Sequence, residues 1–339
     1  MHIALLAVEK CLYSCITGMR DMFVVAGARG SDDHGAPSFA VTVRTMDGKP
    51  VQAFGGFPLT PDGSLNDKNL PIPDVLILPA VLDDLNAFCT DAALLNAIRH
   101  LHQSGTLMAS VCAGSFLLAA AGILDRREAT THWNLAEDFR NRFPKVMLRA
   151  ERMLVDGGDY ICAGGVTAYL DLALYLVSRF RSTEEAASLA RLMLIDPHRE
   201  TQTPYCMAGF RKNHGDRAIL PVQEWLEEHY AEPLTVAALA SRASLGERTF
   251  LRRFRAATGE TPVGYLQRLR MDAARRLLES TTMNVEEITV AVGYADSASF
   301  RKLFRSVTGM PPAAYRERFA IKALPVRHDK TVPAHSPSR

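Results

Sequence analysis

The stretch TFLRRFRAATGETPVGY (residues 249–265) is repeated fifty positions later as SFRKLFRSVTGMPPAAY (residues 299–315). Seven residues are identical between the two copies at this fixed offset. They are Phe250, Phe254, Arg255, Thr258, Gly259, Pro262 and Tyr265 in the first copy and Phe300, Phe304, Arg305, Thr308, Gly309, Pro312 and Tyr315 in the second. Seven identities in one phase are hard to obtain by chance, so the chain contains a duplicated structural unit.

Each copy is predicted to contain a pair of short helices joined by a tight turn. The four helices are expected at residues 235–243 and 247–257 in the first unit and at 285–292 and 297–307 in the second. In the later helix of each pair, apolar residues recur at i, i+4 and i+7 and share one buried face. This pattern is typical of a helix-turn-helix, whose second helix reads the major groove of DNA. A helix predicted over residues 262–280 can hold the two readers about one turn of DNA apart, ~34 Å.

The opposite face of each reading helix is cationic. It carries Arg248, Leu251, Arg252 and Arg255 in the first unit and Ala298, Arg301, Lys302 and Arg305 in the second. Arginine can bridge guanine, and other cations can hold phosphates. We predict DNA contacts from Arg248, Thr249, Arg252, Arg255, Ser297, Ala298, Arg301, Lys302 and Arg305. The alternative is a basic surface that contacts only solvent. This alternative is less favoured because the same cationic pattern occurs on both helices.

Charge is distributed unevenly along the 339 residues. Residues 235–319 contain 14 Lys or Arg against 8 Asp or Glu, or +6, whereas the whole chain carries +2, which leaves −4 for the rest. A basic module joined to a mildly acidic one is typical of a nucleic-acid binder with a separate sensing domain. No apolar run approaches the ~18 residues of a membrane span, and no signal peptide is recognisable. We therefore predict a cytoplasmic protein without a membrane partner.

Short apolar runs alternate with amphipathic stretches through the first 200 residues. Buried strands are predicted at residues 3–8, 39–44, 75–78 and 106–111, and helices at 91–103, 165–180 and 183–194. This alternation predicts an α/β domain with a flavodoxin-like parallel sheet and helices on both faces, followed by the all-α tandem helix-turn-helix domain. The predicted organisation is a first domain at 1–200, a linker at 201–219, a second domain at 220–320 and a disordered tail at 321–339.

The segment from Leu107 to Ala119 is predicted as a buried strand, a small-residue turn and a helix. This order places Cys112 at a helix N-terminus, where partial positive charge lowers the pKa of a thiol. Such a turn has the form of a nucleophile elbow, and His132 is a candidate base. A buried structural cysteine is the simpler alternative. None of the six cysteines has metal-ligand spacing, so no metal site, cofactor or disulfide framework is predicted.

The last hundred residues before the tail resemble the DNA-binding domain of the AraC/XylS family. The matching motifs are Leu239-Ala240, the run from Arg248 to Phe254, Thr258-Gly259 with Pro262, Ala274-Arg275 with Leu277-Leu278, Val292-Gly293-Tyr294, Phe300-Arg301 with Phe304, and Gly309 with Pro312. The chain departs from the family at Ser244, which stands at a common glycine, at Gly246-Glu247, which replaces a common Ser-Pro, and at Thr289. The resemblance implies binding of double-stranded DNA at promoter sites and contact with RNA polymerase.

The N-terminal 195 residues resemble the ThiJ/PfpI superfamily, which is related to class I glutamine amidotransferases. The family's cysteine falls on Cys112 and its histidine on His132. Two departures count against catalysis. Cys15 stands where the family has a carboxylate, and Leu78-Pro79-Ala80-Val81 replaces a Pro-Gly-Gly turn that offers an amide to an oxyanion. The resemblance therefore implies a vestigial site in a protein that is not an enzyme.

Together the two parts resemble the GlxA subgroup of AraC-type regulators, which joins an amidase-like sensor to this DNA-binding module. The resemblance implies an activator that responds to a small metabolite, such as an amino acid or a quaternary amine, and that dimerises through its N-terminal domain. We expect the effector to bind near Cys15, Cys112, His132 and Trp133. Two other functions stay open: a cysteine-dependent hydrolase using Cys112 and His132, and a redox sensor in which Cys15 resolves oxidised Cys112.

Overall fold

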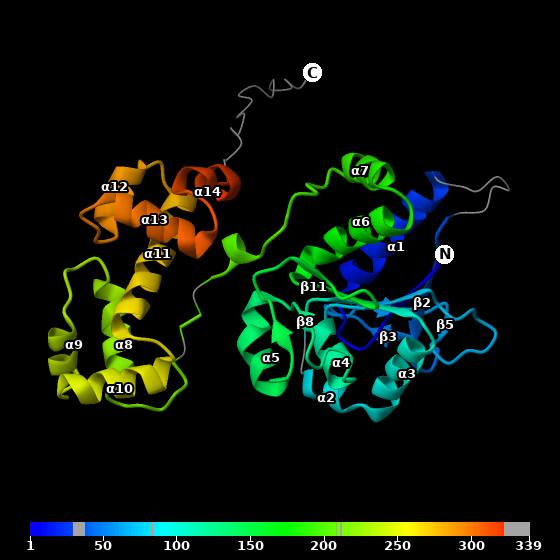
Figure 1. Ribbon diagram of the computed structural model, residues 1–339, viewed down its shortest axis with the longest axis horizontal. Coiled ribbons are helices and arrows are strands. Elements are labelled where there is room, and N and C mark those ends of the chain that lie inside the picture. Colours follow the sequence, from blue (N-terminus) through cyan, green and yellow to red (C-terminus); the bar gives the residue numbers. More distant parts are fainter. Residues whose placement is uncertain (30–37, 83–84, 208, 211, 322–339) are drawn as a thin grey trace, which may run out of the picture. The chain divides into compact units, whose positions relative to one another are not determined.

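The computed structural model describes residues 1–29, 38–82, 85–207, 209–210 and 212–321, which belong to two compact units (Figure 1). The first unit is Met1–Cys206 and the second is Met207–Arg339. Apart from its first residue, the predicted disordered tail lies outside the described residues. No helix of the described part is long and apolar enough to cross a membrane.

A seven-stranded sheet forms the middle layer of the first unit. In spatial order its strands are β10 (Leu154–Asp156), β11 (Tyr160–Ala163), β7 (Leu107–Val111), β6 (Val75–Leu78), β1 (His2–Leu6), β2 (Ala40–Thr45) and β5 (Gly63–Ser64). Neighbouring strands are parallel except β10 and β11. Every residue of β6, β7 and β11 is buried, because helices cover both faces. The predicted parallel α/β sheet is confirmed.

Helices lie on both faces of this sheet (Figure 1). The helices α1 (Tyr13–Arg29), α6 (Tyr169–Phe180) and α7 (Thr183–Leu192) pack against one another on one face. The helices α2 (Leu85–Thr90), α3 (Ala92–Gln103), α4 (Gly114–Ala120) and α5 (Ala136–Arg142) belong to the other. The helix predicted at 165–180 is preceded by a 3-10 turn at Val166–Ala168, and α6 itself begins at Tyr169.

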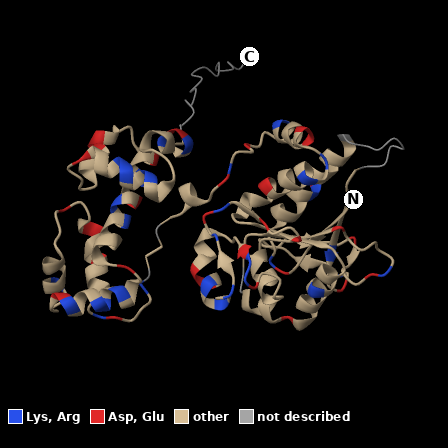
Figure 2. Cartoon of the chain, viewed as in Figure 1, with Lys and Arg blue, Asp and Glu red and all other residues tan. Residues whose placement is uncertain are grey.

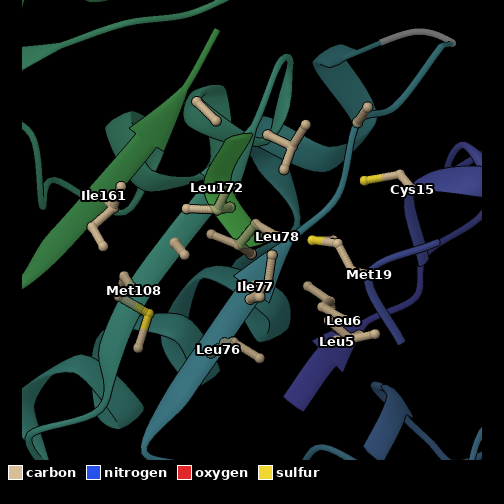
Figure 3. Close-up of a cluster of buried hydrophobic side chains, with 14 of the residues drawn as sticks. Leu5, Leu6, Cys15, Met19, Leu76, Ile77, Leu78, Met108, Ile161 and Leu172 are labelled. Carbon is tan, nitrogen blue, oxygen red and sulfur yellow. The ribbon is translucent and has the colours of Figure 1, made fainter. Parts of the chain in front are cut away.

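Smaller elements complete the first unit. Two pairs of short strands are β3 (Val51–Gln52) with β4 (Pro58–Leu59), which are antiparallel, and β8 (Glu128–Ala129) with β9 (Met147–Leu148), which are parallel. Two further 3-10 turns lie at Trp133–Leu135 and Thr203–Tyr205. The core between the sheet and α1 consists of fully buried side chains, among them Leu5 and Ile77 (Figure 3).

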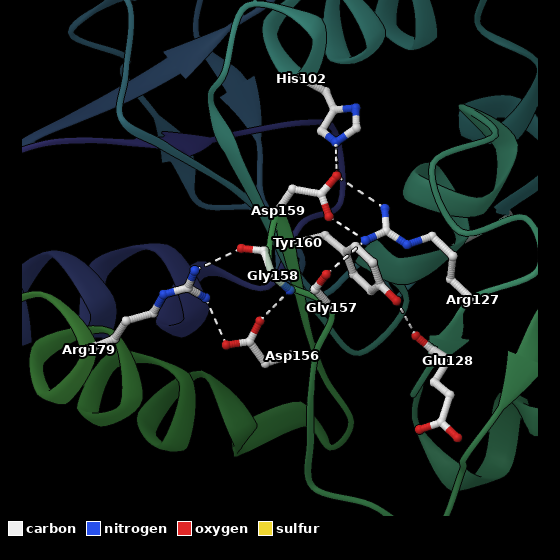
Figure 4. Close-up of polar contacts among 9 residues, drawn as sticks. All are labelled: His102, Arg127, Glu128, Asp156, Gly157, Gly158, Asp159, Tyr160 and Arg179. Atoms are coloured by element: carbon white, nitrogen blue, oxygen red, sulfur yellow. Dashed lines mark hydrogen bonds and ion pairs between the residues drawn. The ribbon is translucent and has the colours of Figure 1, made fainter.

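Two carboxylates secure the turn between β10 and β11 (Figure 4). Asp159 accepts hydrogen bonds from the Arg127 guanidinium, and Nε2 of His102 lies 2.8 Å from the same carboxylate. Asp156 accepts from Arg179 at 2.7 Å. The hydrogen bonds from Arg127 hold the pKa of Asp159 well below its usual range. The turn is therefore held most firmly when its carboxylates are ionised.

The regular elements of the second unit, among its described residues, are all helices. Its helices are α8 (Leu220–His229), α9 (Val236–Arg242), α10 (Glu247–Thr258), α11 (Pro262–Ser280), α12 (Val285–Ala291), α13 (Ser297–Thr308) and α14 (Pro312–Phe319). They surround two separate apolar cores, one for each helix-turn-helix. The pairs α9–α10 and α12–α13 match the predicted helix pairs to within one residue at each end, and α11 spans the predicted connecting helix.

The seven repeated identities correspond to repeated structure. In the first core, the ring of Phe254 lies 5.5 Å from that of Phe250 and meets Tyr265 edge-on at 5.4 Å. The second core repeats this triad, with Phe304 meeting Tyr315 edge-on at 5.4 Å. Each reading helix ends in the same way, at a glycine with φ near +80° that closes its last turn. The duplication therefore preserves the core and the cap, while the outer face is free to differ.

The two helix-turn-helix units are held together by more than α11. Arg270, on α11, donates to the backbone oxygen of Tyr230 at 2.7 Å and lies over the Tyr294 ring at 5.2 Å. Gly293 has φ +81°, and a Cβ there would lie 2.4 Å from the carbonyl oxygen of Ala231. The segment between α8 and α9 therefore packs directly against the turn between α12 and α13.

The boundary between the two compact units falls at Cys206, inside the segment predicted as a linker at 201–219. Thr201 bridges to Arg152, and Gln202 is buried in the first unit, so this unit continues to Cys206. At the other end, Asp216 forms an ion pair with Arg253 of α10. The polar composition of this stretch resembled a linker, but Gln202 is hydrogen-bonded within the first unit, and His214 and Asp216 are bonded within the second.

Candidate DNA interface and effector pocket

Lys and Arg residues lie along several helices of the second unit (Figure 2), and their ion pairs divide them into two kinds. Many arginines are engaged by the protein itself: Arg253 pairs with Asp216, Arg268 with Glu260 and Arg276 with Asp272. Within the described residues, the cations on the outer faces of α10 and α13 have no such partner, except Arg301. These unpartnered, exposed cations are Arg248, Arg252, Arg255, Lys302 and Arg305.

The nine predicted DNA-contact residues all lie on α10 and α13. Seven of them are exposed, whereas Thr249 and Ser297 are half-buried. Arg301 forms an ion pair with Glu286 of α12. Each of the two helices thus exposes a cationic face, and long cationic side chains are the donors that base edges and phosphates of DNA accept from.

The two reading helices start differently. At the beginning of α13, Asp296 accepts hydrogen bonds from the backbone N–H of Ala298 at 3.1 Å and of Ser299 at 2.8 Å. At the beginning of α10, Gly246 provides no side-chain cap. Ser244, in the turn before α10, has φ +54°, the left-handed region that favours glycine. This conformation explains why a glycine is common there in the family that the sequence resembles.

In the first unit, the strand-turn-helix at Cys112 has the predicted elbow geometry. Cys112 has φ +54°, and a Cβ on Gly114 would lie 2.6 Å from the carbonyl oxygen of Leu78. The prediction of a lowered thiol pKa is wrong. Cys112 is 2% exposed, and burial raises the pKa of its thiol to about 12. Desolvation outweighs the dipole of α4, a helix of only seven residues.

His132 and Cys112 line one pocket of about 310 Å³, together with Leu85, Asn134 and Val166. Burial lowers the pKa of His132, whose Nδ1 accepts from the backbone N–H of Asn134 at 3.1 Å. Among the described residues no hydrogen bond joins the imidazole to the Cys112 sulfur. A neutral thiol and an unlinked imidazole do not form an activated nucleophile.

Cys15 does not take part in this pocket. It has no exposed surface and lies in the apolar cluster beside Met19 and Leu78 (Figure 3). Burial raises the pKa of the Cys15 thiol to about 12. Cys15 lines neither pocket of the first unit and has no exposed surface for contact with an effector. No disulfide joins the described cysteines.

A second pocket, of about 190 Å³, shares His132 and Val166 with the first. Trp133 lines it, as expected, and so do three residues that the sequence assigned to no site: Arg199, Gln202 and Tyr205. Gln202 is 1% exposed, and its amide nitrogen donates to the backbone oxygens of Thr131 at 2.8 Å and Ala150 at 2.9 Å. No local signal identified these residues, because only packing brings the segment to the pocket.

A larger cavity of about 520 Å³ adjoins the second pocket through Met153 and Arg199. It lies between α6, α7 and the segment that follows α7. Asp171 and Arg199 form a buried ion pair in its wall, and burial raises the pKa of Asp171 although Arg199 opposes this effect. Among the described residues, no group of three or more His, Cys, Asp or Glu side chains could hold a metal ion.

The site and fold thus define a class of protein: a DNA-binding regulator that carries a second, pocket-bearing domain. Residues 239–318 match the family described as a helix-turn-helix domain, and residues 13–179 match the DJ-1/PfpI family. The transcriptional regulator CdhR of Pseudomonas aeruginosa is 30% identical over 282 residues, which cover 83% of this chain and 82% of that protein. The regulator GlxA of Rhizobium meliloti is 31% identical over 224 residues, covering 65% and 68%.

The chain therefore belongs to the AraC-type transcriptional regulators that join a DJ-1/PfpI domain to a C-terminal tandem helix-turn-helix, the group that includes GlxA. It is a regulator and not an enzyme. Among solved structures, an AraC family transcriptional regulator from Pseudomonas putida matches 57% of this chain and 98% of its own with a TM-score of 0.50 and 20% identity. A putative transcriptional regulator from Vibrio parahaemolyticus matches equally, at 23% identity. These two structures support the fold of the first unit.

Proposed function

We propose that this protein binds promoter DNA with α10 and α13 of one chain and activates transcription when a small metabolite occupies its first unit. The observation that carries the proposal is the set of unpartnered cations on the outer faces of both reading helices. Elsewhere in the second unit, several arginines are engaged by carboxylates or carbonyl oxygens, among them Arg253, Arg268, Arg270 and Arg276. Cations left without partners on two equivalent faces suit a polyanion.

The direct test is binding of the full-length protein to DNA from near its own gene, followed by fluorescence anisotropy at several salt concentrations. Arg252→Ala and Lys302→Ala should each weaken binding about tenfold and lower the salt dependence by one phosphate contact. Arg276→Ala is the matched control, because Arg276 is exposed but paired with Asp272 on α11. Equal behaviour of all three variants would contradict the proposed interface.

The effector is proposed to be an amino acid or a quaternary amine bound at the two joined pockets near Cys112, His132 and Trp133. The rings of His132 and Trp133 lie 5.2 Å apart, and an indole face attracts a quaternary ammonium. Free amino acids, choline and trimethylglycine can be screened by calorimetry. Binding that is lost in Trp133→Leu and kept in Trp225→Phe would support the site.

The pocket wall also suggests how occupancy reaches the second unit. Gln202 accepts a hydrogen bond from the backbone N–H of Trp133 at 3.2 Å, and it lies four residues before the first unit ends at Cys206. A ligand that moves the Trp133 segment therefore acts directly on the chain that leads to the DNA-binding region. This route predicts that effector binding and DNA binding are coupled, which anisotropy with and without effector can measure.

We also propose that the protein dimerises through its first unit and contacts RNA polymerase. Three exposed aromatic residues, Tyr13, Phe54 and Phe57, are close in the fold, and the rings of Tyr13 and Phe57 lie 5.8 Å apart. Such a patch suits a partner surface. Sedimentation of wild type and Phe57→Ser tests the dimer, and transcription in vitro with purified polymerase tests activation.

A further inference from the structure

Arg44, on β2, is a buried cation without a counter-charge among the described residues. Its side chain is 2% exposed, and burial lowers the pKa of its guanidinium. Its hydrogen bonds go to uncharged oxygens, and it joins no ion pair within the described part of the chain. The buried carboxylate of Asp171, by contrast, is paired with Arg199. A covered parallel strand usually carries apolar side chains, so an unpaired arginine on β2 requires a reason other than packing.

The contacts of Arg44 fix the orientation of its guanidinium. Nε donates to Oγ1 of Thr42 at 3.2 Å, and Nη2 donates to the backbone oxygen of Pro71 at 2.7 Å. These bonds tie β2 to the segment before β6, but they use only two of the five N–H groups of a guanidinium. Among the described residues Nη1 has no hydrogen-bond partner, yet it keeps accessible surface. Three N–H groups of a buried cation therefore remain for a ligand.

Arg44 lines a cavity of about 480 Å³. The cavity lies between the end of β2, residues 65–73 and α3. None of its described lining residues belongs to the three cavities of the first unit already described. Much of its wall is aliphatic, with side chains from Leu65, Leu70, Ile72 and Leu101. The cavity therefore combines an apolar wall with one unpaired buried cation.

The charges around the cavity favour a ligand with a single negative charge. Lys68 and His100 line it and are exposed, and Lys68 forms no ion pair within the described residues. Asp67 also lines it, and its carboxylate accepts from the backbone N–H of Asn69 at 2.8 Å. This carboxylate repels a doubly charged anion more strongly than a singly charged one. A planar carboxylate, which can accept two N–H groups of one guanidinium, therefore suits the cavity better than a phosphate.

We propose that this cavity is a second ligand site of the first unit and that it binds a short-chain aliphatic carboxylate. The carboxylate accepts hydrogen bonds from the unused N–H groups of Arg44 and supplies the missing counter-charge. The hydrocarbon chain lies against Leu65, Leu70 and Leu101. Because Arg44 also holds the backbone of Pro71, the ligand stabilises the segment between β5 and β6. The site depends neither on the proposed effector pocket nor on DNA binding.

The first experiment is calorimetry of the full-length protein with three probes that share a hydrocarbon chain: hexanoate, hexanamide and hexyl phosphate. Hexanoate should bind as one molecule per chain. Hexanamide has nearly the same shape without the charge, so it should bind at least about tenfold more weakly. Hexyl phosphate, which is mostly doubly charged above about pH 7, should also bind more weakly than hexanoate. Absence of hexanoate binding, equal binding of hexanamide, or tighter binding of hexyl phosphate would overturn the proposal.

Variants then locate the site. Arg44→Met should weaken hexanoate binding at least about tenfold, because it removes the cation. Since this variant also loses the bond to Pro71, a second pair of variants is made at Ile72. Ile72 is 67% exposed and lines the cavity, so Ile72→Glu and Ile72→Gln should both fold, which circular dichroism melts would check. The two side chains differ in charge and hardly in shape, and Ile72→Glu should bind hexanoate about tenfold more weakly than Ile72→Gln.

Lys49→Gln is the control for the loss of a surface cation. Lys49 is exposed, pairs with Asp47 and lies outside the cavity lining, so this variant should bind hexanoate as the wild type does. Equal affinities of the two Ile72 variants would overturn the proposal. Loss of binding in Trp133→Leu together with full binding in Arg44→Met would assign hexanoate to the effector pocket instead. Neither result would affect the proposed DNA interface.

Discussion

Replacing Gln202 with leucine is expected to destabilise the first unit strongly. The side chain is 1% exposed, and leucine has a similar size, so the change removes hydrogen bonds without opening a large cavity. The amide nitrogen has only two hydrogens, and its shortest contacts are the carbonyl oxygens of Thr131 and Ala150. The amide oxygen accepts from the backbone N–H of Trp133. Leucine therefore leaves three backbone groups without this partner.

The magnitude follows from these three groups. Each buried polar group that loses its partner costs about 1 kcal/mol or more, so the free energy of unfolding should fall by about 3 kcal/mol. For a unit of this size, such a loss lowers the melting temperature by roughly 6 to 12 °C. The carbonyl oxygen of Arg152 also accepts from Gln202, but its loss of this partner should add little to the destabilisation, because the hydroxyl of Thr130 donates to the same oxygen at 2.8 Å.

The assay uses the distribution of the two tryptophans. Trp133 lies in the first unit and Trp225 in the second, so a Trp225→Phe background makes fluorescence report the first unit alone. Urea titration then gives the change in the free energy of unfolding. Gln103→Leu, an exposed change in the same unit, is the control and should stay within about 0.5 kcal/mol. A loss below about 1 kcal/mol for Gln202→Leu would refute the account of Gln202 as a satisfied buried amide.

Three further changes test other parts of the structure. Gly293→Ala should unfold the second helix-turn-helix and abolish DNA binding in an anisotropy assay, because its Cβ would lie 2.4 Å from the Ala231 oxygen at φ +81°. Iodoacetamide labelling of Cys112, followed by mass spectrometry, should be slow up to about pH 10, since the pKa of the thiol in the folded protein is about 12. Because this pKa exceeds that of the unfolded chain, the free energy of unfolding should fall as the pH rises above about 9. Asp159→Asn should lower the melting temperature at pH 7 and should make the melting temperature fall less on acidification below pH 4. Arg127 lowers the pKa of Asp159 in the folded protein, so the stability that the ionised carboxylate adds is lost when Asp159 is protonated. Rapid labelling at pH 8, or an unchanged acid profile, would count against these assignments.

Much of the second unit could be predicted because its signals are local and repeated. The spacing of Phe250 and Phe254 places both rings on one helix face, and the same spacing recurs at Phe300 and Phe304. The structure confirms both helix pairs and their boundaries to within one residue. The linker could not be predicted, because a buried glutamine such as Gln202 looks like any polar loop residue until its acceptors are known.

The effector site stays a prediction, although three of the four residues expected there line pockets of the first unit. His132, Trp133 and Cys112 line the joined pockets, but Cys15 does not. The resemblance placed Cys15 beside Cys112, and only the packing of α1 against the sheet shows that Cys15 is completely buried. The sign of the Cys112 pKa shift was also wrong, because a helix N-terminus is visible in sequence whereas desolvation is not.

By itself, the sequence determined that this protein has a parallel α/β unit and two helix-turn-helix units, because periodicity and duplication follow from backbone geometry and local burial. The tertiary structure decided which cations of the protein remain without partners, which thiols are desolvated, and that the segment with Arg199, Gln202 and Tyr205 lines the pocket. The physical reason is common to all three. Ion pairing, desolvation and pocket lining depend on groups that lie far apart along the chain, and only the packed fold brings them within a few ångströms of one another.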